Sequence, residues 1–299
     1  MRLIIFYVSS EIATQPDNWE RAADQASRAA HAFPEPGERV AVVGCGTSWF
    51  IAQAYASLRE SGGRGVTDAF AASEALLASR DYDRIVVISR SGTTTEIVDL
   101  MTAAPAGVPI TAITSSADTP VARLGADTHI LDFADERSVV QTRFATTALA
   151  LLRASLGENL ESAVSAARAA VERPLETAWL AAEQFTFLGR GWTNGIAMEA
   201  GLKMREAAQM WTECYPVMEY RHGPISIAAP NRVVWSFGTE SSGLADEVAA
   251  TGALLVENRT DAMADLILTQ RLAVALAEDK GLDADNPRNL TRAVILGGR

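Results

Sequence analysis

The stretch "ISRSGTTTE", residues 88–96, places five hydroxyl side chains and one arginine within nine residues, directly after the apolar run "RIVV". Backbone N–H groups at the start of a helix, together with small hydroxyl side chains, form a site for an anion. An arginine beside them adds a charged donor that suits phosphate. We therefore expect a phosphate site here, with the ligands Ser89, Arg90, Ser91 and Thr94.

The same stretch also has a purely structural interpretation. Thr93 and Glu96 have the S/T-x-x-E spacing of a capping box for the helix "EIVDLMTAA". An arginine on a turn is more often simply solvated, so Arg90 by itself does not decide between the two. The capping box explains two residues and leaves the other hydroxyl groups unexplained.

A second charged group lies in "GIAMEAGLKMREAAQMWTECYPVMEYRHGP". At 100° per residue, Glu199, Lys203 and Glu206 fall within about 60° of one another on a helix and form one charged stripe. The stripe is either a solvent-facing Glu–Lys ladder or, on a buried helix, an internal ion-pair network or an active-site wall. Burial is favoured because apolar residues occupy the other sides: Ile196, Met198, Leu202, Met204, Ala207 and Trp211.

His222 follows in "RHGP", where a proline restrains the backbone, and is one of three histidines. A carboxylate with a lysine and a histidine in reach can transfer protons. Moving a hydrogen between C1 and C2 of an open-chain sugar needs one such carboxylate, and a second acid–base group opens the ring. The sequence contains no serine-hydrolase elbow, zinc set or Walker loop.

A glycine turn, "VVGCGTSWF", runs from an apolar strand into Thr47 and Ser48. Glycines there let the backbone turn sharply and approach a ligand, and hydroxyl groups at a helix start cap it or bind an anion. A dinucleotide fingerprint fits poorly, because Trp49 or Phe50 replaces the third glycine of GxGxxG. A structural turn and a ligand-binding loop are equally open here.

An α/β fold must position these groups, because apolar β-branched runs alternate with stretches of helical period. Strands are predicted at 40–43, 85–89, 110–114 and 129–133, followed by a mostly helical connector. The rhythm restarts with "FTFLGRG", "RVVWSFG" and "GALLVEN". At an offset of 145 residues, Gly44 and Gly46 fall on Gly189 and Gly191, which predicts an internal repeat. We place the boundary within 155–175 and the two domains at 1–160 and 161–299.

The composition describes a globular chain of 299 residues that is 48% hydrophobic. The net charge of −11 opposes binding to nucleic acid or to an acidic membrane surface. No apolar run reaches the roughly 20 residues of a membrane span. The N-terminal "MRLIIFYVSSE" is interpreted as a strand or a tag-like extension. Cys45 and Cys214 form neither a metal set nor a disulfide framework, so a cytoplasmic protein is expected.

Together these motifs resemble the sugar isomerase (SIS) family of phosphosugar-binding proteins, specifically the tandem-domain isomerase portion of glucosamine-6-phosphate synthase and its stand-alone relatives. The motifs in chain order are "EIATQP", "GCGTS", "SRSGTTTE", "ERSVVQTRFATTALALL", "FLGRG", "AMEAGLKMREAAQMWTE", "RHGP" and "DADNPRNLTRAV". The resemblance covers nearly the whole chain. It implies two tandem domains, each a doubly wound five-stranded parallel sheet flanked by helices, as in flavodoxin-like folds.

The resemblance also implies roles for individual residues. The phosphosugar-binding residues would be Thr47, Ser48, Ser89, Arg90, Ser91, Thr94, Gln141 and Glu199. Glu206 would shuttle the proton, Lys203 would support the developing charge, and His222 would assist ring opening. In the family this histidine reaches the neighbouring subunit's site, which implies a homodimer. No metal and no organic cofactor are expected.

Three departures from the synthase pattern matter. The chain starts at the "EIATQP" segment, so a glutaminase domain is expected to be missing. Arg90 replaces a glutamine, and Arg292 replaces the lysine that forms a Schiff base with the ketose. A guanidinium cannot form that imine, so Arg292 is expected to stabilise oxyanion charge instead.

The expected function is therefore isomerisation of a hexose 6-phosphate or deamination of an amino-sugar 6-phosphate. Two alternatives stay open. One is a non-catalytic sugar-phosphate sensor, although no helix-turn-helix or basic DNA-binding arm is visible. The other is an aminotransferase subunit that takes ammonia from a separate glutaminase.

Overall fold

The computed structural model describes residues 6–238 and 242–297, which form two compact units. The five-stranded unit comprises residues 17–136, 143–160 and 290–299. The four-stranded unit comprises residues 1–16, 137–142 and 161–289. One break between the units falls after Leu160, but each unit also takes a segment from the other half of the chain. The division into domains 1–160 and 161–299 stays a prediction.

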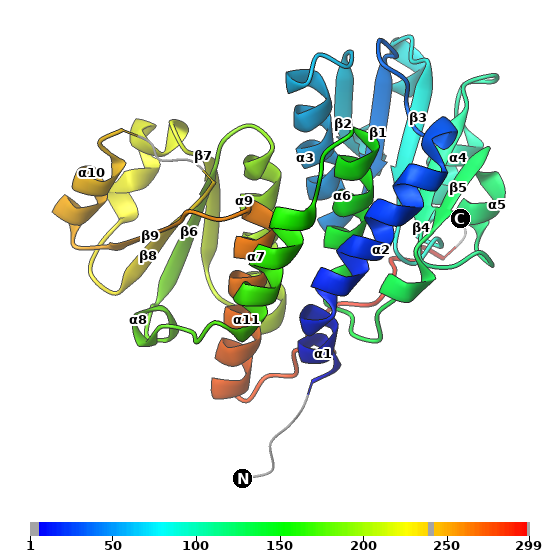
Figure 1. The fold of residues 1–299 in the computed structure, drawn as a ribbon. Coiled ribbons are helices and arrows are strands. Elements are labelled where there is room, and N and C mark those ends of the chain that lie inside the picture. Colours follow the sequence, from blue (N-terminus) through cyan, green and yellow to red (C-terminus); the bar gives the residue numbers. More distant parts are fainter. Residues whose placement is uncertain (1–5, 239–241, 298–299) are drawn as a thin grey trace. The chain divides into compact units, whose positions relative to one another are not determined.

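The sheet of the five-stranded unit has the order β2-β1-β3-β4-β5, and all its strands are parallel (Figure 1). Its strands are β1 (Val40–Gly44), β2 (Thr67–Ala71), β3 (Arg84–Ile88), β4 (Ile110–Thr114) and β5 (Asp127–Ile130). The chain passes from β1 to β2 on one side and then to β3 on the other. The sheet therefore has a switch point between β1 and β3, where ligands bind at the carboxyl ends of the strands.

Helices cover both faces of this sheet. They are α2 (Gln15–Arg28, in this unit from Asp17), α3 (Thr47–Ser61), α4 (Thr95–Thr102), α5 (Pro120–Leu124) and α6 (Arg143–Ser155). Helix α3 packs on β1, β2 and α6, whereas α4 packs on α5. Alternate strand residues such as Val43, Val87 and Ala112 form one core cluster with Ile97 and Met101 of α4. The residues between them are buried on the opposite face, so the central strands read as continuous apolar runs.

The sheet of the four-stranded unit has the order β7-β6-β8-β9, again all parallel (Figure 1). Its strands are β6 (Gln184–Gly189), β7 (Thr212–Pro216), β8 (Arg232–Phe237) and β9 (Leu254–Asn258). Its helices are α1 (Tyr7–Ala13), α7 (Glu161–Glu172), α8 (Thr177–Leu180), α9 (Thr193–Ala208), α10 (Leu244–Thr251) and α11 (Ala262–Asp279). Helix α11 packs against α9, α7 and α1, and α10 packs on β9.

The expected fold class is therefore confirmed as α/β, but the expectation of five strands in each sheet is wrong for the second one. After β9 the chain enters α11, and the described residues beyond that helix form no strand. The position that β5 takes in the first sheet thus has no counterpart in the second. Among the described residues, no helix is long and apolar enough to cross a membrane.

The strands predicted at 40–43, 85–89 and 110–114 are confirmed to within one residue, and each of the three later motifs overlaps a strand. The strand predicted at 129–133 instead ends at Ile130 and is followed by a 3-10 turn. Strands β2 and β7 were not predicted. Both lie at sheet edges and carry polar residues in "TDAFA" and "TECYP", so their apolar signal is weak.

Two glycines on matching strands meet the same steric constraint. A Cβ on Gly44 would lie 2.4 Å from the carbonyl carbon of Ser48, and one on Gly189 would lie 2.4 Å from that of Thr193. In both cases the first turn of the following helix closes directly onto the end of the strand. Gly46 and Gly191 each follow with positive φ angles of 53° and 57°. The two turns thus share one geometry, and the repeat at an offset of 145 residues stays a prediction.

The N-terminal strand prediction is wrong for the described residues, which form helix α1, while residues 1–5 lie outside the description. The first turn of α1 is held by a distant carboxylate. The N–H groups of Tyr7 and Val8 donate to the two carboxylate oxygens of Asp285, each at 2.8 Å. The Val139 N–H donates to the Asp285 carbonyl at 2.7 Å. Asp285 therefore ties helix α1 and segment 137–142 to the rest of the four-stranded unit.

We expect Asp285→Ala to lower the free energy of unfolding by about 1 to 3 kcal/mol, because two buried or half-buried N–H groups lose a charged acceptor. Urea unfolding followed by circular dichroism measures this. Asp118→Ala is the matched control, because the Asp118 side chain is solvent-exposed and pairs only with exposed Arg123. Equal stabilities of the two variants would contradict the anchoring role.

Candidate functional site

The hydroxyl-rich loop, residues 89–94, follows β3 directly at the carboxyl edge of the first sheet. The Ser89 Oγ accepts the Gly92 N–H at 3.2 Å, and the Ser91 Oγ accepts the Thr93 N–H at 3.3 Å. The Ser91 and Thr94 hydroxyl oxygens lie 3.3 Å apart. These bonds fold the loop so that the hydroxyl groups converge, and hydroxyl protons are available as donors to an anion.

The capping-box interpretation of this loop is wrong. Helix α4 begins at Thr95, and its N-cap is Thr94 rather than Thr93. The Thr94 side chain makes no capping hydrogen bond. Gly92 has a φ of 63°, and a Cβ there would lie 2.4 Å from the Thr119 hydroxyl oxygen, so only glycine fits. The loop is therefore shaped by its own serines and by this close approach.

Arg90 is neither solvated nor open to solvent, being only 4% exposed. Its Nη1 lies 3.4 Å from the Glu136 Oε2, and Glu136 is 1% exposed. Its Nη2 donates to the Arg292 carbonyl at 3.1 Å. The other Glu136 oxygen accepts the Arg143 N–H at 2.8 Å. The interpretation of Arg90 as a solvated residue is therefore wrong, and its charge is balanced within the protein.

Thr47 and Ser48 open helix α3 at the carboxyl end of β1 and are both buried. The Ser48 N–H donates to the Cys45 carbonyl at 3.1 Å, which makes the turn tight. Because β1 and β3 are neighbours, this turn and the Ser89 loop lie at the switch point of the sheet. The five-stranded unit thus brings two hydroxyl-bearing turns to one edge.

The charged stripe on α9 is buried, and the solvent-facing ladder is the wrong interpretation. Glu199 is fully buried and Lys203 is 1% exposed, with the Lys203 Nζ 3.6 Å from the Glu199 Oε1. The same Nζ forms a second, shorter ion pair with Glu206, whose side chain is 18% exposed. Lys203 therefore sits between two carboxylates, and Glu206 is the one that solvent or a ligand can reach.

Helix α9 ends in a way that the sequence did not reveal. Gln209 adopts the left-handed conformation with a φ of 53°, and its N–H donates to the Met204 carbonyl. Trp211 consequently lies beyond the helix and is 76% exposed. The prediction that Trp211 covers the helix is wrong, whereas Ile196, Met204 and Ala207 are buried as expected.

His222 and Gln141 also belong to the four-stranded unit. His222 ends a 3-10 turn (Glu219–His222) and is exposed, with Gly223 at a φ of 132° and Pro224 after it. Among the described residues, no hydrogen bond or ion pair joins His222 to Glu206. The Gln141 Oε1 is buried without a hydrogen-bond partner in the described part of the chain. Such an atom is costly unless a ligand satisfies it.

Arg292, in the C-terminal segment, belongs to the five-stranded unit. Its guanidinium donates to the Glu136 carbonyl and forms an ion pair with Asp135. The predicted residues thus divide into a hydroxyl-rich group with Arg90 and Arg292 on one unit, and a proton-transfer group on the other. Sequence reasoning assigned no role to Asp135 or Glu136, although the quoted motif "ERSVVQTR" begins with Glu136.

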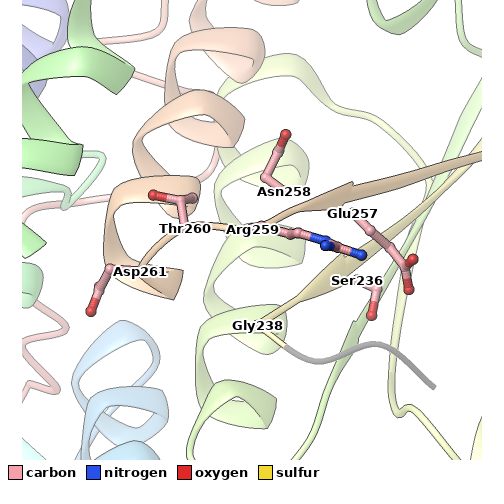
Figure 2. A pocket seen from close by; sticks show the side chains of 7 residues that line it. All are labelled: Ser236, Gly238, Glu257, Asn258, Arg259, Thr260 and Asp261. Carbon is pink, nitrogen blue, oxygen red and sulfur yellow. The ribbon is translucent and has the colours of Figure 1, made fainter.

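A cavity of about 590 Å³ lies on the four-stranded unit at the carboxyl ends of β8 and β9 (Figure 2). It is lined by Ser236, Gly238, Glu257, Asn258, Arg259, Thr260 and Asp261. In Figure 2 the Arg259 side chain extends toward Glu257 and Ser236. No motif in the sequence pointed to this cavity.

The described residues contain no cluster of His, Cys, Asp and Glu that could hold a metal ion.

Beside the cavity, Asp265 is a buried carboxyl group in the first turn of α11. Its two oxygens accept the Trp235 Nε1–H at 3.0 Å and an Asn258 Nδ2–H at 2.7 Å. Asn258 in turn accepts from Arg173 at 2.8 Å. Burial raises the pKa of Asp265 to about 7, and the two donated hydrogen bonds offset this only in part.

We expect the folded protein to lose stability as Asp265 ionises. Its folded pKa lies above the roughly 3.9 of an unfolded chain, so its contribution is full below that value and disappears as pH rises through about 7. Relative to Asp265→Asn, the wild type should lose about 2 to 3 kcal/mol of unfolding free energy between pH 5 and pH 8. Urea unfolding at both pH values measures this difference. If the unfolding free energies of the wild type and of Asp265→Asn changed equally between the two pH values, the prediction would be wrong.

Comparison with known proteins assigns residues 36–156 to the SIS domain family. The glutamine–fructose-6-phosphate aminotransferase (isomerizing) of Streptococcus pyogenes is 28% identical in an alignment 261 residues long, which covers 71% of this chain and 43% of that protein. The protein of the same name from Sulfurisphaera tokodaii is 27% identical in an alignment 295 residues long, which covers 87% of this chain and 50% of that protein. The chain thus spans about half the length of the curated relatives it matches.

Two solved structures share the fold. The glucosamine-6-phosphate deaminase of Thermotoga maritima matches with a TM-score of 0.76 at 21% identity, covering 97% of this chain and 100% of that one. The tagatose-6-phosphate ketose/aldose isomerase of Escherichia coli matches with a TM-score of 0.77 at 20% identity, covering 98% and 96%. Residues 36–156 thus match the SIS domain model, and the chain as a whole has the fold of these two structures.

Proposed function

We propose that this protein is an enzyme of the cytoplasm that isomerises a hexose 6-phosphate or deaminates an amino-sugar 6-phosphate by moving a proton between C1 and C2. The observation that carries this proposal is the buried array on α9, where Lys203 pairs with both Glu199 and Glu206. The names of the similar proteins, which include a deaminase, a ketose/aldose isomerase and an isomerising aminotransferase, support the same chemistry.

The phosphate group would bind at the loop after β3. Ser89, Ser91 and Thr94 supply hydroxyl donors there, and the loop lies beside the start of α4, whose partial positive charge favours an anion. Thr47 and Ser48 lie at the end of the neighbouring strand and would contact the sugar. The unpartnered Gln141 Oε1 is a further candidate for a sugar hydroxyl group. Glu199, expected from the resemblance to bind the sugar, is fully buried and pairs with Lys203, so we propose that it orients Lys203 instead.

Glu206 would act as the base. It takes the proton from C2 of the open-chain aldose and returns it to C1, while the proton of the O2 hydroxyl passes to O1. The aldehyde thereby becomes a primary alcohol and C2 becomes the carbonyl carbon. The Lys203 ammonium next to Glu206 would stabilise the negative charge of the enediolate. From an amino sugar the same transfer leaves an imine at C2, and addition of water then releases ammonia.

His222 would open the sugar ring as a second acid–base group. Its exposure and the absence of a described contact with Glu206 fit a residue that acts at the site of a second subunit, and we propose a homodimer on this basis. Arg292 cannot form an imine, so it would contribute charge rather than covalent chemistry. Arg292 stands where the synthase has the lysine that forms a Schiff base with the ketose. Because that lysine is replaced, a non-catalytic sugar-phosphate sensor is the second candidate function.

Incubation with a panel of hexosamine and ketohexose 6-phosphates tests the proposal. We expect release of ammonia and ketose phosphate, or aldose–ketose interconversion, on at least one substrate without added metal. Binding of a phosphosugar with no turnover on any would instead establish the sensor. Turnover that requires a co-purifying glutaminase would point to an aminotransferase subunit.

Glu206→Gln should lower kcat by at least about 100-fold, because the amide cannot accept the proton, while phosphosugar affinity changes less than about threefold. Steady-state kinetics and isothermal titration calorimetry provide the two readouts. Glu183→Gln, the same change at an exposed position of the same unit, is the matched control. If Glu206→Gln unfolds the unit or abolishes binding, the array is a structural ion pair.

A further inference from the structure

The C-terminal segment 290–297, called the tail here, is attached to both ends of the hydroxyl-rich loop within the five-stranded unit. At the α4 end, the Thr95 N–H donates to the Val294 carbonyl at 3.1 Å, and the Leu296 N–H donates to the Thr95 Oγ1 at 2.9 Å. At the β3 end, the Arg90 Nη2 donates to the Arg292 carbonyl at 3.1 Å. The tail therefore bridges the loop.

The guanidinium of Arg90 is oriented by a buried carboxylate. Glu136 lies beside its Nη1, and the Arg143 N–H fixes the other Glu136 oxygen. Both charged side chains are almost wholly removed from water, so separating them would leave an uncompensated buried charge. With Nη1 on the carboxylate, the planar guanidinium presents its Nη2 to the tail carbonyl.

Glu136 is also joined to the tail from the other side. Its carbonyl accepts from the Arg292 guanidinium, which in addition pairs with the Asp135 carboxylate. Arg90 and Arg292 thus both bind Glu136, one at the side chain and one at the backbone. The hydrogen bond from Arg90 to the Arg292 carbonyl joins these two arginines directly, so Arg90, Glu136 and Arg292 form a closed ring of contacts.

We propose that Arg90 is a positioning residue that holds the tail across the hydroxyl-rich loop and that it does not bind the phosphate group. Its charge is balanced by Glu136, and the contacts of its Nη1 and Nη2 lead to that carboxylate and to the tail. The tail takes up the Thr95 N–H, so an anion on this loop is bound by hydroxyl groups and the remaining amides. The consequence for turnover rests on the proposed function, whereas the attachment of the tail does not.

Hydrogen exchange measured by mass spectrometry on the full chain tests the attachment. In Arg90→Gln, amides of the tail should exchange at least about tenfold faster, because a hydrogen bond from a charged donor is lost. Amides of β1 and β4 should keep their rates, which a general structural role of Arg90 would not allow. Arg123→Gln, an exposed arginine of the same unit, is the matched control and should leave the tail unchanged.

Arg90→Gln also removes a charged partner of the buried Glu136, so the double variant Arg90→Gln/Glu136→Gln is measured alongside it. The double variant removes both charges at nearly constant volume and should fold while its tail still exchanges faster. A tail that exchanges at the wild-type rate in the folded double variant overturns the proposal. So does exchange that rises equally in β1 and β4.

Phosphate binding separates this proposal from a direct ligand role. In a titration with inorganic phosphate followed by ³¹P NMR, the double variant should bind within about twofold of the wild type. A loss of about tenfold or more, with tail exchange unchanged, would make Arg90 a ligand instead. If the tail responds as expected but the wild type turns over no phosphosugar, the proposed function fails and the positioning role stands.

Discussion

A charge that is buried in a protein must be paired, and this constraint organises both groups of candidate residues. On the five-stranded unit, the carboxylate of Glu136 is paired by Arg90, and that pair determines where the C-terminal tail can attach. On the four-stranded unit, Lys203 lies between Glu199 and Glu206 along one side of α9. Since breaking either arrangement would leave an uncompensated charge, each holds its side chains in one geometry.

The second constraint is steric and lies at the glycine turns. Gly44 and Gly189 each let the first turn of a helix close onto the end of a strand, where any Cβ would collide with backbone atoms. All strands within each sheet are parallel, so their carboxyl ends share one edge. The turns after β1 and β3 therefore bring Thr47 and Ser89 to the same edge, although they are far apart along the chain.

The central strands could be predicted because they are buried on both faces and read as apolar runs, as in "VAVVG" and "RIVVI". The edge strands "TDAFA" and "TECYP" could not, because half-exposed strands carry polar residues. In the described residues the second sheet has four strands, and the fifth was expected because a resemblance transfers a family's strand count as a whole. The apolar residues around the α9 stripe correctly predicted that the stripe is buried. The exposure of Trp211 could not be predicted, because it depends on the left-handed conformation of Gln209, which ends the helix.

By itself the sequence determined the α/β class, the central strands and the residue types that make phosphate binding and proton transfer credible, because these follow from local periodicity and side-chain chemistry. Only the tertiary structure decided the partners of those residues. Arg90 reads as a solvated residue or an anion ligand until Glu136 and the Arg292 carbonyl, one of them 202 residues away, are seen beside it. Pairing between distant segments depends on how strands and tail are brought together, and no local pattern records it.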